Sequence, residues 1–245
     1  MKGRYLYALV PGGSDRTYGC LGINGGDVYT ISNGNVAAAV SNVDVQRIRP
    51  ERRHFAAHQS VIVRLLQDGA LLPMSFGIIS SNSKAVRDIL SRNRKAILEQ
   101  LQQVAGKVEM GLRVSWDVPN IFEYLVNTHL ELRAARDRLL GTNREPTQDE
   151  KIEIGRLVES ILIADRDRHY ERVEQVLAPR CADMKRNRCR DEREVMNLAC
   201  LVRRDFLKEF EAGVFEAARF FDDNFAFDYN GPWAPHHFVE ISIDV

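Results

Sequence analysis

Two prolines three residues apart, Pro232 and Pro235, constrain the last part of this 245-residue chain more than any other feature. Each proline fixes its own φ angle and lacks a backbone N–H, and each pushes the preceding residue toward an extended conformation. Trp233 lies between them, and polar and apolar residues alternate at 239–243. We therefore expect a stiff, non-helical bend that carries Trp233, followed by a strand. Taken alone, this pattern is typical of a Trp side chain that covers the core of a small domain.

The charge balance excludes one broad class of function. The chain carries 34 Lys and Arg residues against 34 Asp and Glu residues, so its formal net charge is zero. General nucleic-acid binders and proteins of anionic membrane surfaces normally show a basic excess, so we expect no nucleic-acid partner. A net charge of zero also removes a barrier to self-association.

The cysteines and the hydropathy pattern indicate a cytosolic protein. Cys20, Cys181, Cys189 and Cys200 form no C-x-x-C pair, and four thiols in a chain of this length are not a disulfide scaffold. We expect them to be reduced. No run of apolar residues approaches the ~18 needed for a membrane span, and the N-terminus shows no signal-peptide pattern.

Residues 1–116 are predicted to form a first domain. A chain of 245 residues is long enough for one large domain or two small ones. Asn33 and Gly34 mark a hairpin turn, and residues 36–43 are apolar on both faces, which is typical of a central strand. The expected strands are 5–10, 28–32, 36–43, 72–79 and 108–116, and the expected helices are 50–69 and 83–106. Two helices on one face of a mixed sheet predict an α/β sandwich of the ferredoxin-like kind.

One detail of the first expected helix bears on the later argument. Pro50 suits the first turn, and Gly69 suits the end of the helix. Its predicted inward stripe consists of Phe55, Val61 or Ile62, Leu65 and Leu66.

Residues 117–245 are predicted to form a second α+β domain. Thr147 and Glu150 stand at the spacing of a capping box, which predicts the start of a long helix that continues to Leu177. That helix and an expected helix at 117–140 would form an antiparallel hairpin. The remaining expected elements are an irregular basic connection at 180–190, a strand at 195–202, a helix at 205–221, and strands at 225–229 and 238–245.

Histidines and cysteines offer only weak metal sites. His54 and His58 stand four residues apart on one expected helix, a spacing that suits a metal, but no acidic residue of a metalloprotease motif accompanies them. Cys181 and Cys189 lie far in sequence from His236 and His237, with irregular spacing and no knuckle-like flanks. Packed or surface side chains explain both sets better, so we expect no metal and no other cofactor.

Two further segments invite a binding interpretation. The loop at 12–26 is rich in glycine and follows a strand, but it lacks the G-x-G-x-x-G pattern and the P-loop lysine. The basic cluster at 180–190 has no interleaved aromatic residues and is followed at once by acidic residues, which is typical of a solvated loop. No Ser/His/Asp or Cys/His arrangement and no defensible carboxylate pair is found, so we expect no catalytic residues.

Several motifs, taken in order, resemble one known family. The run at 231–239 (GPWAPHHFV) resembles the C-terminal signature of the gas vesicle protein F/L family, and residues 5–10 (YLYALV) resemble its opening strand. His58, the run at 72–77 (LPMSFG), residues 106–112 and residues 196–202 agree with the family in the same order. The chain departs from the family pattern at Ser75, Cys200, Ala234 and His236, which bears on surface contacts at those positions.

The resemblance implies a fold and a function. It implies a ferredoxin-like N-terminal domain, a second α+β domain with added helices, and a non-enzymatic role in building gas vesicles. The implied partners are the hydrophobic major shell protein and other gas vesicle accessory proteins, with the chain in the cytoplasm before assembly and at the gas vesicle afterwards. Our candidate partner-binding residues are Pro73, Phe76, Trp233 and Phe238. For His58 we expect a hydrogen bond to a nearby backbone carbonyl.

An alternative from another class remains open at this point. Ferredoxin-like domains host many unrelated activities, so the chain could be a small-ligand sensor or an enzyme. The glycine-rich loop at 12–26 is the feature that favours this alternative.

Overall fold

The structure, a computed structural model, describes residues 3–44, 47–141 and 144–240. It contains two compact units: Met1–Glu109 together with Pro232–Val245, and Met110–Gly231. We expected a domain boundary between residues 116 and 117, with all residues from 117 to 245 in the second domain. The structure instead groups the last segment with the first unit, because Val239 packs against the core of that unit.

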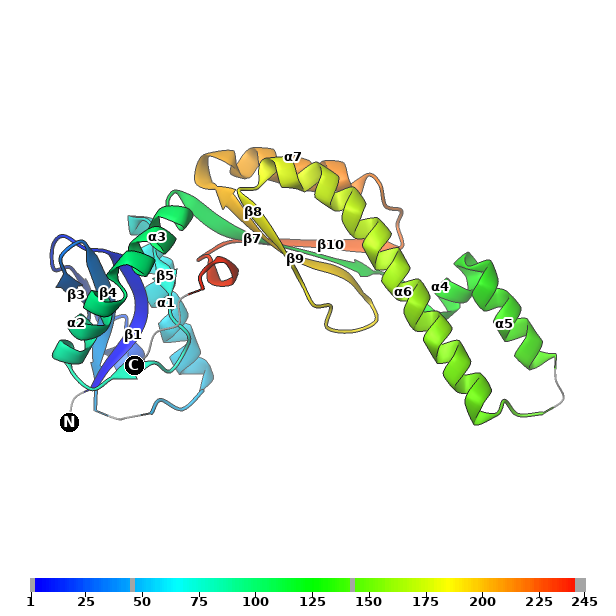
Figure 1. Cartoon of the computed structure of the whole chain (residues 1–245), viewed down its shortest axis with the longest axis horizontal. Coiled ribbons are helices and arrows are strands. Elements are labelled where there is room, and N and C mark those ends of the chain that lie inside the picture. The colour runs from blue at the N-terminus through cyan, green and yellow to red at the C-terminus, as the bar shows by residue number, and fades with distance from the viewer. Residues whose placement is uncertain (1–2, 45–46, 142–143, 241–245) are drawn as a thin grey trace. The chain divides into compact units, whose positions relative to one another are not determined.

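The first unit is built on one antiparallel sheet (Figure 1). The sheet order is β2-β3-β4-β1-β5, and β6 also pairs with β1. The strands are β1 (Gly3–Pro11), β2 (Thr17–Gly19), β3 (Val28–Asn33), β4 (Val36–Val43), β5 (Leu72–Pro73) and β6 (Ile79–Ser80). The helices are α1 (Arg52–Asp68), α2 (Ser83–Arg92) and α3 (Arg94–Val104), with short 3₁₀ helices at Ile23–Gly25 and His236–Phe238.

Helices cover both faces of this sheet, not one face as expected. Leu6 and Val40 belong to a core with Leu90 and Ile97 of α2 and α3. Tyr5 and Tyr7 instead place their rings against His58 of α1. The strands with apolar residues on both faces required this arrangement, since each face must be buried.

The α+β class is confirmed, but the ferredoxin-like detail is not. A ferredoxin-like domain follows its first strand with a helix, in the order β-α-β-β-α-β. Here β1 to β4 all precede α1. The hairpin turn was predicted at the right place: β3 and β4 pair up to Asn33 and Val36, and Gly34 has a φ angle of 66°, which favours glycine.

The expected helix at 83–106 is two helices separated by Asn93. The backbone N–H of Asn93 and its side-chain amide both donate to the carbonyl of Ile89, at 3.1 and 2.9 Å. Such local side-chain bonds compete with helix continuation. Asn82, not Ser83, caps α2, and its side chain accepts from the N–H of Ala85 at 3.0 Å.

The second unit is a sheet covered by long helices. The sheet order is β10-β7-β9-β8, and α6 and α7 pack against each other and against β9 (Figure 1). The strands are β7 (Lys107–Trp116), β8 (Asp183–Asn187), β9 (Glu194–Arg203) and β10 (Phe225–Trp233), of which β7 and β10 each contain a unit boundary. The helices are α4 (Ile121–Thr128), α5 (Leu130–Leu140), α6 (Gln148–Leu177) and α7 (Leu207–Ala218), with 3₁₀ turns at Ala178–Arg180 and Arg204–Phe206.

The helical hairpin is present, and its long helix starts where the capping box predicted. The N–H of Glu150 donates to Oγ1 of Thr147 at 3.3 Å, and the N–H of Thr147 donates to Oε2 of Glu150 at 2.8 Å. The expected helix at 117–140 is broken at His129, whose backbone is extended (φ −117°, ψ 116°). The hairpin is therefore formed by α5 and α6, which contact each other.

Two segments near the C-terminal end differ from expectation. The basic connection at 180–190 contains the strand β8, which pairs antiparallel with β9 along its whole length. The strand expected at 225–229 extends to Trp233, so that Pro232 lies near the strand end, where a missing donor is tolerated. A strand was expected at 238–245. The structure has a 3₁₀ helix at His236–Phe238 instead of the start of that strand, and residues 241–245 lie outside the described residues.

Candidate partner-binding surface

The segment Leu72 to Gly77 was expected to lie in one strand, but it forms a turn between two short strands. Pro73 of β5 pairs with Ala8, and β6 pairs with β1 further along. Between these strands, the N–H of Met74 still donates to the carbonyl of Tyr7 at 2.9 Å. Gly77 then takes a φ angle of 94°, which an extended strand does not allow. The chain consequently leaves the sheet at Ser75 and Phe76.

Two buried side chains fix this turn from below. His58 lies 2.9 Å from the hydroxyl of Tyr5 through Nδ1 and 3.2 Å from the carbonyl of Met74 through Nε2. The N–H of Gly77 donates to the Tyr5 hydroxyl at 3.1 Å. The predicted hydrogen bond of His58 to a backbone carbonyl is thus confirmed, and the resulting network holds both ends of the turn.

Burial sets the protonation state of this network. It lowers the pKa of His58 to about 4 and raises the pKa of Tyr5 to about 12. At neutral pH both groups are therefore uncharged. The Tyr5 O–H donates to Nδ1 of His58, and Nε2–H of His58 donates to Met74, so each donor has an acceptor.

The turn presents Phe76 to a second phenylalanine on α1. The rings of Phe55 and Phe76 are stacked with centroids 4.1 Å apart. Tyr5 and His58 contact Phe76 edge-on from the buried side, with ring centroids 6.1 and 5.8 Å from it. Phe55 is 48% exposed and Phe76 is half-buried, so the stacked pair is partly open to solvent on one face of the first unit.

This position of Phe55 corrects the predicted stripe of α1. The stripe placed Phe55 inward, whereas the structure buries His54 and His58 beside Val61, Ile62, Leu65 and Leu66. His54 finds partners there: Nδ1 lies 2.8 Å from the carbonyl of Arg49, and Nε2 lies 3.1 Å from Oδ1 of Asn24. A buried polar residue is stable only when it is hydrogen-bonded, and these partners become visible only in the fold.

The Pro-Trp bend separates one exposed side chain from several buried ones. Trp233 is 41% exposed, whereas Ala234 and Phe238 are 1% and 2% exposed. Glu109 anchors the segment, because its carboxylate accepts from the N–H of His237 at 2.9 Å and contacts Nδ1 of the same residue at 2.6 Å. Of our four candidates, Trp233 is exposed, Pro73 and Phe76 are half-buried, and Phe238 is a core residue.

The residues considered for metal or ligand chemistry are engaged elsewhere. Both ring nitrogens of His54 and both of His58 have protein partners. Within the described ranges, no three His, Cys, Asp or Glu side chains gather as a metal site requires. The glycine-rich loop borders a cavity of about 120 Å³, which is smaller than typical small-molecule sites.

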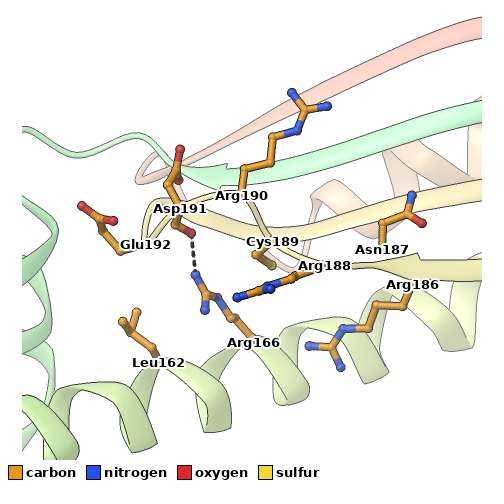
Figure 2. A pocket seen from close by; sticks show the side chains of 9 residues that line it. All are labelled: Leu162, Arg166, Arg186, Asn187, Arg188, Cys189, Arg190, Asp191 and Glu192. Carbon is orange, nitrogen blue, oxygen red and sulfur yellow. Dashed lines mark hydrogen bonds between the residues drawn. The ribbon is translucent and has the colours of Figure 1, made fainter.

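A second candidate surface lies in the other unit and is polar. An open pocket of about 640 Å³ lies between α6 and the turn that joins β8 to β9 (Figure 2). It is lined by four arginines, two carboxylates and three other residues: Arg166, Arg186, Arg188, Arg190, Asp191, Glu192, Leu162, Asn187 and Cys189. The sequence indicated the basic cluster, but Arg166, which α6 contributes, was not part of it.

The comparisons with known proteins agree over most of the chain. The family described as gas vesicle synthesis protein GvpL/GvpF matches residues 3–240. Gas vesicle protein F of Nostoc sp. (strain PCC 7120) is 26% identical over 98% of this chain and 99% of its own length. Gas vesicle protein F of Streptomyces sp. (strain CB03234) is 28% identical over 87% and 88%, respectively.

Solved structures show the same fold. The crystal structure of gas vesicle protein GvpF from Anabaena sp. PCC7120 superposes with a TM-score of 0.86 at 24% identity, covering 99% of this chain and all of that chain. GvpF from Microcystis aeruginosa gives a TM-score of 0.82 at 21% identity, covering 98% and 99%.

These findings define the class. The chain is an α+β protein, and the family that matches it is described as a gas vesicle synthesis protein. The chain belongs to the gas vesicle synthesis protein GvpL/GvpF family. Membership supports a role in gas vesicle assembly. Among the helices that the structure describes, none is long and apolar enough to cross a membrane.

Proposed function

We propose that this chain is a non-enzymatic accessory protein that binds the hydrophobic major shell protein of gas vesicles during nucleation or growth. A shell subunit that exposes an apolar face aggregates unless another protein covers that face. The chain would act in the cytoplasm before it associates with the vesicle, together with other gas vesicle accessory proteins. Its family membership and its exposed aromatic surface support this proposal.

The observation that carries the proposal is the stacked pair of Phe55 and Phe76. Aromatic side chains are enriched in the cores of protein interfaces because they bury much area and lose little conformational entropy. Here Tyr5 and His58 fix Phe76 from the buried side, so the pair is preorganised before a partner arrives. Phe55 stays 48% exposed while it is stacked on Phe76, so the pair has apolar area left to bury against a partner.

The strand order suggests how the shell subunit could be held. β5 ends the sheet order next to β1, and Phe76 follows β5 by three residues. An extended segment of a partner can add to such an edge by backbone hydrogen bonds, while side-chain contacts supply specificity. We assign the specific contacts to Phe76 and Phe55, with Trp233 as a further contact in the same unit.

The test is co-purification of the tagged chain with co-expressed major shell protein. We expect wild-type protein to retain the shell subunit and the double variant Phe55→Ala, Phe76→Ala to lose most of it, with a smaller loss for Trp233→Ala. Phe215→Ala is the matched control, because Phe215 is 66% exposed and lies in the other unit. Circular dichroism confirms that each variant is folded. Equal retention by all variants, or no retention by the wild type, would contradict the proposal.

A further inference from the structure

We infer that the arginine-lined pocket between α6 and the β8–β9 turn binds an acidic segment of a partner protein, and that the arginines contact the carboxylates of that segment. This goes beyond the proposed contact with the shell subunit, which involves the first unit only. The pocket residues all belong to the second unit.

Two of the four guanidinium groups are held in place. Arg166 donates through Nε to the carbonyl of Glu194 at 3.0 Å and through an Nη to the carbonyl of Asp191 at 2.8 Å. Because backbone carbonyls carry no net charge, these bonds orient Arg166 without neutralising it. Arg186 donates to Asp167 at 2.7 Å and lies over the ring of Tyr170. The pocket is therefore partly preorganised for an anion.

The other two guanidinium groups are uncommitted. Across residues 3–44, 47–141 and 144–240, no hydrogen bond or ion pair engages the side chain of Arg188 or Arg190, and both are exposed. Figure 2 shows Arg188 extending from the turn toward Arg166. Guanidinium groups gathered on one surface repel one another, and an anion between them relieves this repulsion. A carboxylate also matches the paired N–H groups of arginine in geometry.

The nearby carboxylates do not already fill this role. Oδ1 of Asp191 accepts from the N–H groups of Arg193 and Glu194, at 2.9 and 3.1 Å, which stabilises the turn itself. Glu194 is buried, and its carboxylate lies 2.8 Å from Nε of Arg113. The pocket lining thus has four arginines against the two acidic side chains Asp191 and Glu192, and one of the four, Arg186, is already paired with Asp167 outside the lining.

The lining favours an acidic peptide over a nucleic acid. It contains no aromatic ring on which a base could stack, and its apolar contribution is Leu162 and Cys189. Asp191 and Glu192 would repel the continuous negative charge of a phosphate backbone, whereas a peptide of mixed charge can place a cation beside them. At about 640 Å³, the opening is also much larger than one phosphate or carboxylate group needs.

Beside the pocket, β8 offers backbone groups to the same partner. β8 ends the sheet order next to β9, and its last two residues, Arg186 and Asn187, line the pocket. An extended acidic segment could add along β8 and place its carboxylates among Arg166, Arg186 and Arg188.

The experiment measures fluorescence anisotropy of a short labelled peptide that alternates Glu with Ala, against the same peptide with Gln in place of Glu. We expect the Glu peptide to bind the full chain and the Gln peptide not to bind it. The affinity for the Glu peptide should fall as the salt concentration is raised. The double variant Arg188→Gln, Arg190→Gln should weaken binding by about tenfold or more, since each lost charge-assisted hydrogen bond contributes to affinity.

The matched control is Arg156→Gln, Arg219→Gln, which removes the same charge from exposed positions of the same unit. It should bind the Glu peptide as the wild type does. Equal weakening by both double variants would overturn the inference, because the attraction would then be diffuse. So would absence of binding, or tighter binding of a single-stranded RNA that depends on Arg188 and Arg190. The assay contains no shell protein, so its failure leaves the proposed function untouched.

Discussion

Nε2 of His129 lies 3.2 Å from Oδ2 of Asp165, and this contact joins the corner between α4 and α5 to the middle of α6. The His129 ring also contacts the carbonyl of Leu125 through Nδ1 at 3.1 Å, so it spans the helix break and the long helix. Asp165 is 5% exposed and is paired with Arg168 as well. The buried carboxylate of Asp165 therefore holds the α4–α5 corner, where the hairpin helix α5 begins, against the second hairpin helix α6.

Removal of that carboxylate should loosen the hairpin. We expect Asp165→Ala to lower the free energy of unfolding by about 1–3 kcal/mol, because it leaves a partly buried donor of His129 without its acceptor. Chemical denaturation measures the change. Asp137→Ala is the control, since Asp137 is 59% exposed in its pair with Arg136 and should cost no more than about 1 kcal/mol. Equal effects of the two substitutions would contradict the assigned role of Asp165.

The stability of the first unit should depend on pH through His58. Its pKa is about 4 in the folded chain against 6.5 when unperturbed, so the unfolded state binds more protons between these values. The contribution of neutral His58 is fully present above about pH 6.5 and is lost as pH falls toward about 4. Linkage gives an upper value of about 3 kcal/mol for this loss.

The measurement compares the unfolding free energy of wild type and His58→Gln across this pH range. Other groups titrate alike in both proteins, so the difference isolates His58. We expect the wild type to lose more stability than the variant as the solution is acidified. Parallel curves for the two proteins would show that His58 is not buried as a neutral ring.

The Tyr5 hydroxyl should hold the turn that carries Phe76. We expect Tyr5→Phe to speed hydrogen exchange at the Gly77 amide, which loses its acceptor, and to lower stability by about 1–3 kcal/mol. Tyr29→Phe is the matched control, because the Tyr29 hydroxyl donates to Asn42 at an exposed site. Unchanged exchange at Gly77 would mean that the turn is fixed by other contacts.

The capping box should decide how firmly α6 begins. We expect Thr147→Ala to destabilise the first turn of α6 by about 1 kcal/mol, because the N–H of Glu150 loses its side-chain acceptor. Hydrogen exchange at the first turn of α6 should increase while the last turns, near Leu177, stay protected. Exchange at the first turn that stays as slow in the variant as in the wild type would argue that packing alone sets the start of α6.

Local signals predicted the elements that local physics determines. The capping box at Thr147 and the turn at Gly34 depend on residues a few positions apart, and both stand where the sequence placed them. The breaks at Asn93 and His129 were missed, although each residue bonds the preceding helical turn with its own side chain. Competition of an Asn side chain with the helix could have indicated the break at Asn93.

Features that depend on distant partners could not be predicted in this way. His54 and His58 displaced Phe55 from the buried face because Asn24, Tyr5 and the carbonyl of Met74 supply their hydrogen bonds. The basic segment at 183–187 became a strand because β9 pairs with it, and its own residues gave no apolar alternation. Of the candidate contacts, Trp233 is exposed, Phe76 is half-buried and Phe238 is buried, a distinction that the sequence pattern alone does not make.

The most direct test of the central claim is site-specific photo-crosslinking at Phe55. A benzoylphenylalanine placed at this exposed position should crosslink to the co-expressed major shell protein on illumination, and mass spectrometry should identify the conjugate. The same residue placed at Phe215, which is more exposed but lies in the other unit, should give little or no conjugate. Equal crosslinking from both positions, or none from Phe55 in the folded protein, would contradict binding through the Phe55–Phe76 pair.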